Sequence, residues 1–102
     1  MSYFVTVNFG ISGWADGGDE SRRVVLKQKL EEIGLRKTVT GRTGRALTLP
    51  RNTFAGEFNG ESAAKVRDDI TPRVMEVFQS VGGQGRVFVI VSTGWAWATR
   101  TV

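Results

Sequence analysis

The sequence predicts an α+β fold, a ferredoxin-like βαββαβ sandwich whose antiparallel sheet carries two helices on one face. Two observations support this prediction. The hydrophobic pattern changes along the chain in the order strand, helix, two strands, helix, strand, which is the order of the split βαβ motif. The length of 102 residues suits one hydrophobic core, so residues 1–102 are expected to form a single ferredoxin-like domain. The second face of the sheet should be bare.

The first strand and the first helix follow from two different periods. Residues 3–9 alternate with a period of two, which places on one face Tyr3, Val5, Val7 and Phe9. Residues 11–19 form a loop rich in glycine and aspartate. Residues 20–33 are expected to be a helix, because an apolar stripe with helical spacing consists of Leu26, Leu30 and Ile33. Gly34 should end this helix, since a C-terminal cap often needs positive φ.

The middle of the chain should supply two more strands. Residues 35–49 are expected to form the second strand and its turn, because Val39 and Thr40 favour an extended chain and residues 41–45 are typical of a turn or bulge. The third strand is predicted over residues 53–58, after Pro50 interrupts the pattern.

A second helix is expected after Ser62, which is a suitable N-cap. Its apolar residues recur every three or four positions up to Val81, as on one face of a helix. Pro72 lies within this stretch and would cost about 3 kcal/mol inside a helix, so one helix or two short helices in line both fit. Residues 86–91 then form a nearly all-apolar strand, and residues 95–102 either extend it or form an extra C-terminal edge strand.

Composition limits the chemistry that the chain can perform. It contains no cysteine and no histidine, which excludes disulfides, thiolate metal sites, a cysteine nucleophile and the usual general base. Catalysis would have to use carboxylates, lysine, tyrosine, serine or threonine, with a hard cation such as Mg²⁺. The net charge is +4, and a basic domain of this kind is compatible with nucleic-acid binding.

The sequence pattern gives no sign of a membrane protein. The first residues lack the basic and apolar regions of a signal peptide, and no apolar run approaches the roughly 18 residues of a membrane span. A cytoplasmic protein is therefore expected.

A basic segment without acidic residues extends from residue 36 to residue 51. Its cations are Arg36, Lys37, Arg42, Arg45 and Arg51. Arginines on a hairpin can contact phosphates through two nitrogens, which predicts RNA binding. The alternative is a solvated hairpin whose charges protect an edge strand from pairing with another chain.

Aromatic and acidic residues add two further candidate sites. Trp95 and Trp97 would share one face of the last strand and could form a homodimer interface, cover the sheet or stack on bases. Phe54 and Phe58 are expected in the core rather than on a base-stacking surface. Asp16, with its neighbours Asp19 and Glu20, could hold a hydrated Mg²⁺, although acids before a helix more often act as caps.

Two segments of the sequence resemble a known family. Residues 3–8, Tyr-Phe-Val-Thr-Val-Asn, and residues 49–55, Leu-Pro-Arg-Asn-Thr-Phe-Ala, are similar to the first strand and the entry to the third strand of the GhoS-type antitoxin endoribonucleases. These are small proteins with the CRISPR-adaptation-nuclease version of the ferredoxin-like fold. The resemblance implies RNA contact, a dimer completed by the last strand, and a toxin partner. The CRISPR-adaptation relatives have a metal-binding aspartate where this chain has Asn8.

These expectations combine into two functional hypotheses. In the first, the protein binds RNA through Arg42, Arg45 and Arg51 and cleaves mRNA as an antitoxin-type endoribonuclease, with Asn8 near the active centre. Because an amide is a poor Mg²⁺ ligand, Asp16 or an arginine-based mechanism would then replace the missing aspartate. In the second, it is a non-catalytic phage- or plasmid-type protein-interaction module whose Trp95 and Trp97 edge binds another protein.

Overall fold

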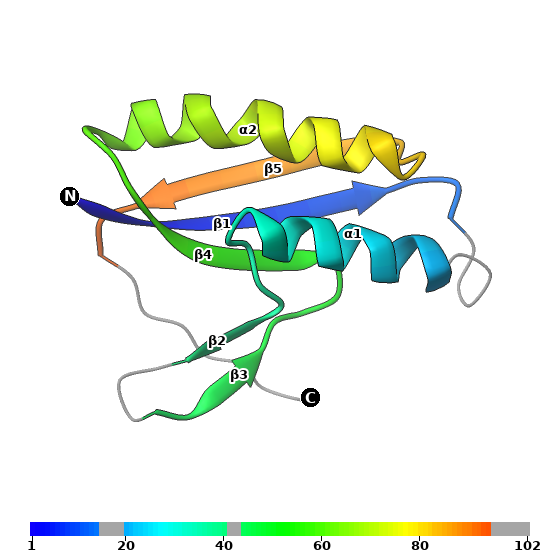
Figure 1. Cartoon of the computed structure of the whole chain (residues 1–102), viewed down its shortest axis with the longest axis horizontal. Helices are drawn as coiled ribbons and strands as arrows, with labels where there is room; N and C mark the ends of the chain where they lie inside the picture. The colour runs from blue at the N-terminus through cyan, green and yellow to red at the C-terminus, as the bar shows by residue number, and fades with distance from the viewer. Residues whose placement is uncertain (15–19, 41–43, 95–102) are drawn as a thin grey trace.

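The computed structural model describes residues 1–14, 20–40 and 44–94, which form an α+β arrangement (Figure 1). Along the chain the elements are β1 (Ser2–Ile11), α1 (Glu20–Glu32), β2 (Thr38–Thr40), β3 (Ala46–Thr48), β4 (Thr53–Asn59), α2 (Ala63–Ser80) and β5 (Gly85–Ser92). The predicted C-terminal edge strand, residues 95–102, lies outside the described residues. In the part of the chain that is described, none of the helices is long and apolar enough to cross a membrane.

The main sheet has three antiparallel strands in the order β4-β1-β5. Its central strand β1 pairs through Val7 with Phe54 of β4 and with Val89 of β5. Because side chains alternate along a strand, the odd-numbered residues of β1 lie on one face and the even-numbered residues on the other. Every odd-numbered residue from Tyr3 to Phe9 is buried, as the period of two predicts.

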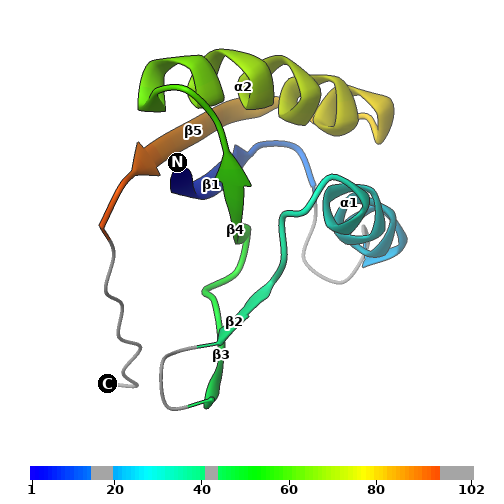
Figure 2. The same cartoon turned by 60° about the vertical axis from the view of Figure 1, so that its left-hand side comes forward.

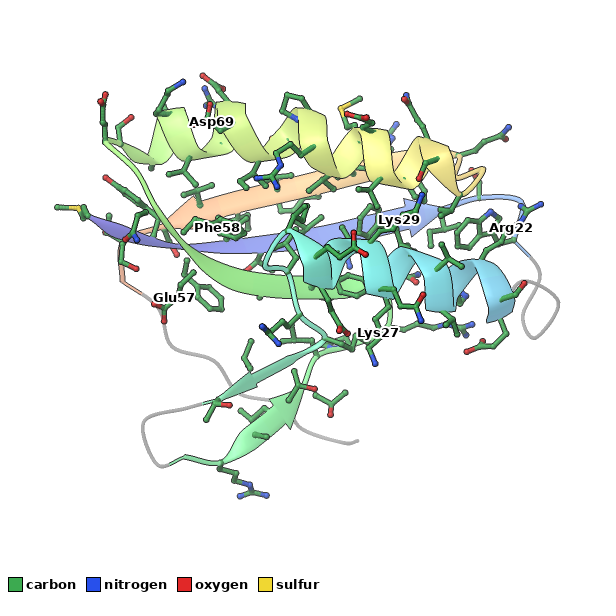
Figure 3. The ribbon with its side chains drawn as sticks, viewed as in Figure 1. Arg22, Lys27, Lys29, Glu57, Phe58 and Asp69 are labelled. Carbon is green, nitrogen blue, oxygen red and sulfur yellow. The ribbon has the colours of Figure 1, made fainter. Side chains whose placement is uncertain are left out.

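Both helices pack on the face formed by these odd-numbered residues (Figures 1 and 2). The buried helix residues are Leu26 and Leu30 of α1, and Val66, Ile70, Val74 and Phe78 of α2. Phe9 lies at the centre of this core, with its ring 4.9 Å from that of Phe78 and 6.0 Å from that of Phe54. The prediction that Phe54 and Phe58 pack in the core is therefore confirmed. Figure 3 shows Phe58 and its neighbour Glu57 on opposite sides of β4.

The end of α1 follows the predicted capping pattern. The helix ends at Glu32, and Gly34 has a φ of 97°, a conformation that an L side chain rarely adopts. The backbone N–H of Leu35 then donates to the carbonyl of Leu30 at 2.9 Å, and the Leu35 side chain is fully buried. The chain thereby reverses direction and reaches the outer edge of β4.

Pro72 does not divide the second helix. Ser62 caps it by accepting a hydrogen bond from the backbone N–H of Lys65 at 3.0 Å, and α2 continues for 18 residues through the proline. Pro72 itself is exposed, while the buried residues Ile70 and Val74 on either side of it keep one continuous apolar face against the sheet. Burial of that face outweighs the hydrogen bond lost at the proline.

The predicted second strand becomes a separate hairpin. Arg36 pairs with Ala55 of β4 through two backbone hydrogen bonds of 2.8 and 2.9 Å. From Lys37 onward the chain pairs with its own return segment instead, beginning with a 2.8 Å bond from Leu49 N–H to the Lys37 carbonyl. Strands β2 and β3 form this two-stranded sheet, which projects from the main sheet away from α2 (Figures 1 and 2).

Candidate functional site

A basic pocket lies between α1 and the turn that leads into β4. The cavity has a volume of about 470 Å³, and four cationic side chains line it: Arg23, Lys27, Lys37 and Arg51. Among the described lining residues Glu20 is the one acid, and Leu26 and Phe54 supply apolar surface. We call this cavity the basic pocket.

The elements around the pocket explain why its cations converge. Arg23 and Lys27 are four residues apart and therefore occupy one face of α1. Figure 3 shows Lys27 on the side of α1 that faces the β2–β3 hairpin. Lys37 enters from the first extended residues after α1. Arg51 belongs to the turn before β4, which is closed by a 3.1 Å hydrogen bond from Thr53 N–H to the Pro50 carbonyl.

Lys37 is held in place by the same turn. Its ammonium donates to the Pro50 carbonyl and, at 3.5 Å, to the Thr53 carbonyl, and it lies 5.3 Å from the centre of the Phe54 ring. Burial lowers the pKa of Lys37, and the positive charges of Arg23, Arg51 and Lys27 lower it further. The pocket therefore has an excess of positive charge that a bound anion would relieve.

Arg23 connects α1 to the turn. One of its terminal nitrogens donates to the side-chain carbonyl of Asn52, a residue of the turn whose φ is 65°. Its guanidinium also lies 5.6 Å from the ring centre of Trp14. The Nε of Arg23 is buried and has no hydrogen-bond partner among the described residues. Arg23 thus connects α1 to the turn and forms part of the pocket lining.

The structure divides the cations that the sequence grouped together. Lys37 and Arg51 line the basic pocket, whereas the adjacent Arg36 is exposed beside Ala55. Arg45 is exposed at the start of the β3 arm of the hairpin and does not line the pocket. Arg42 lies outside the described residues.

Sequence reasoning missed Arg23 and Lys27. Their signal was present in the i, i+4 spacing of two cations on α1, which places them on one side of the helix. The connection to Lys37 and Arg51 could not be seen, because it depends on how α1 packs against the turn before β4.

Asn8, which was predicted to lie near the active centre, does not line the basic pocket. Asn8 is exposed on the face of β1 opposite the helices, and its side-chain nitrogen donates to Thr53 Oγ1 at 2.9 Å. Asp16, Trp95 and Trp97 lie outside the described residues. Within residues 1–14, 20–40 and 44–94, no group of three acidic, cysteine or histidine side chains could hold a metal ion.

Comparison with known proteins assigns no family to the chain. No protein-family model matches the sequence, and no curated protein matches it either. The functional proposal therefore depends on the geometry and charge of the basic pocket.

Proposed function

We propose that this protein binds RNA and that the basic pocket contacts the phosphates. The observation that carries the proposal is the convergence of four cations on one cavity with a single described acid. Cationic side chains that replace the counterions condensed on RNA phosphates give affinity of this kind without any sequence requirement. The resemblance of residues 3–8 and 49–55 to antitoxin endoribonucleases supports RNA as the ligand.

The position of the pocket also fits a ferredoxin-like sheet. Ala55 uses its backbone N–H and carbonyl to pair with Arg36, while its neighbour on the other side is Thr6 of β1. This pairing supports the strand order β5, β1, β4 and then residue 36, which is the arrangement proposed here for the whole domain. Lys37 would then lie at the outer edge of that sheet, where an extended RNA backbone can reach it.

Cleavage of the bound RNA is a separate prediction. It depends on Asn8 and Asp16, with Mg²⁺ as the possible cofactor, and the basic pocket supports binding alone. A homodimer and a protein partner that use Trp95 and Trp97 likewise stay predictions.

Affinity measurements with matched variants test the proposal. The double variant Lys27→Gln and Arg51→Gln removes two charges from the pocket, and both side chains are exposed, so the fold should tolerate the change. The control, Lys65→Gln and Arg67→Gln, removes two charges from the exposed side of α2. We expect the pocket variant to bind a labelled mixed-sequence RNA at least about tenfold more weakly, since contacts to charged groups contribute about 1.5–3 kcal/mol.

The control variant decides whether the location of the removed charges or the change in net charge weakens RNA binding. It should bind within about threefold of the unchanged protein, because Lys65 and Arg67 do not line the basic pocket and each is already paired with an aspartate of α2. Equal losses in the two variants would contradict a specific phosphate site. The same reactions with added Mg²⁺, followed on a gel, show whether the bound RNA is also cut.

A further inference from the structure

The sheet face opposite the helices carries an exposed aromatic side chain beside polar groups. Phe88 and Ile90 of β5 are 60% and 48% exposed, although both are large and apolar. We define the open face by the residues Asn8, Thr53, Arg86, Phe88 and Ile90. Large apolar side chains exposed together usually mark a binding surface.

One row of side chains across the sheet, formed by Thr53, Asn8 and Phe88, combines an aromatic ring with hydrogen-bonding groups, as the binding of an unpaired base requires. Asn8 of β1 has Thr53 as its register partner on β4 and Phe88 as its register partner on β5. The 2.9 Å hydrogen bond from Asn8 to Thr53 Oγ1 uses one amide hydrogen, which leaves the amide oxygen as an acceptor and the threonine hydroxyl as a donor. An aromatic ring therefore lies next to a fixed donor and acceptor.

The open face and the basic pocket meet at the same turn. Thr53 follows Arg51 by two residues, and the carbonyl of Asn52 accepts a 2.9 Å hydrogen bond from the backbone of Phe9. Phe88 is two strands from Thr53, a separation of about 10 Å that a few nucleotides can span. A strand of RNA with its phosphates in the pocket could therefore place its bases on the open face.

Charge and polarity favour RNA over a second copy of this chain on this face. Arg86 is exposed on β5 two residues before Phe88, and Arg36 is exposed beside β4 near Thr53, so cations lie on and beside the open face. Close packing of an apolar protein surface over Asn8 and Thr53 would leave their remaining polar groups without partners. A nucleobase can hydrogen-bond to those groups and stack on Phe88 at the same time.

We propose that the open face is a platform for unpaired RNA bases, on which Phe88 stacks one base while Asn8 and Thr53 hydrogen-bond to a neighbouring base. This inference rests on the proposed RNA binding and narrows its substrate to single strands. Stacking on one aromatic residue is sequence-tolerant, so the protein should accept many sequences but distinguish unpaired from paired RNA.

Substitutions at Phe88 test the platform with a short mixed-sequence RNA, used alone or paired with its complement. Phe88→Ala and Phe88→Leu should weaken binding of the single strand about tenfold, whereas Phe88→Trp should preserve it. None of the three should change the affinity for the duplex, because its bases are not available for stacking. The leucine variant separates loss of the aromatic ring from loss of apolar area.

The outcomes separate this inference from the proposed function. Unchanged single-strand binding by Phe88→Ala and Phe88→Leu, with weaker binding by the Lys27 and Arg51 variant, overturns the platform and leaves the basic pocket intact. Absence of RNA binding at low salt overturns both. If Phe88→Ala instead converts a dimer to monomers in analytical ultracentrifugation and RNA affinity is unchanged, the open face is an interface between copies and the platform is refuted.

Discussion

Removing Lys27 and Arg51 together should flatten the salt dependence of RNA binding. Both cations line the basic pocket, and each comes from a different element, α1 or the turn before β4. If each neutralises one phosphate, its loss removes one set of counterions that RNA binding would release. The effect on the slope is therefore specific to ion release and independent of any change in the overall affinity.

The expected change follows from the number of charges removed. For a single strand, the logarithm of the affinity falls with the logarithm of salt concentration by about 0.7 for each neutralised phosphate. Loss of two contacts should reduce the magnitude of the slope by about 1.4. Between about 50 and 200 mM salt, the unchanged protein should therefore lose about sevenfold more affinity than the variant.

Fluorescence anisotropy of a labelled RNA at several salt concentrations measures both slopes directly. Parallel lines for the unchanged protein and the variant would refute phosphate contact by Lys27 and Arg51, even if the variant bound more weakly. The Lys65 and Arg67 control should keep the original slope, because those cations lie on the exposed side of α2. An equal flattening in the control would show that net charge, and not the pocket, governs binding.

Three further predictions concern the fold that positions the pocket. In Gly56→Ala the added Cβ would lie 2.0 Å from the Gly34 carbonyl oxygen, so the free energy of unfolding measured in urea should fall by about 3 kcal/mol. The control Gly10→Ala should change it little, because the nearest atoms to its added Cβ are 3.8 Å away. Ser62→Ala removes the N-cap of α2 and should lower the free energy of unfolding by about 1 kcal/mol, measured in the same way. The folded state lowers the pKa of Lys37 from its ordinary value of 10.5. Lys37 therefore keeps its proton to a higher pH in the unfolded chain than in the folded one, and the free energy of unfolding should rise as the pH approaches 10.5. Lys37→Met should remove this rise, which urea titrations at alkaline pH would measure.

Local periodicity was enough to predict the elements that build the core. The alternation of β1 and the stripes of α1 and α2 identified residues such as Val7, Leu30 and Val74, which are fully buried. Gly34 was also predictable, because the need for positive φ at the end of a helix is a local property of the chain. These features depend on neighbours within a few residues, which is the range over which sequence patterns carry information.

The hairpin and the continuity of α2 depended on competition between distant interactions. After Arg36, the chain could pair either with β4 or with its own return segment, and both choices satisfy the same backbone groups. At Pro72, a local cost opposed the burial of one apolar face on the sheet. The sequence left open whether Pro72 divides the helix, and it did not show that the second strand would leave the main sheet, since each outcome is decided by packing across the domain.

The basic pocket shows a related limit of reasoning from sequence proximity. Arg36 and Lys37 are adjacent, but alternation along an extended chain directs them to opposite sides, so one borders the open face and the other enters the pocket. Arg23, far away in sequence, is the true neighbour of Lys37. The run of cations in the sequence therefore indicated a positively charged region, but two of the four cations that line the pocket, Arg23 and Lys27, come from α1.

Asn8 links the question of cleavage to the question of recognition. A neutral amide is a poor ligand for Mg²⁺, but it is well suited to the edge of a nucleobase because it offers both a donor and an acceptor. Its hydrogen bond to Thr53 and its register pairing with Phe88 place it within a row that could contact bases. The amide of Asn8 that weakens the case for a metal-dependent nuclease therefore strengthens the proposal that the protein binds single strands, with the phosphates of the RNA in the basic pocket on the other side of the turn.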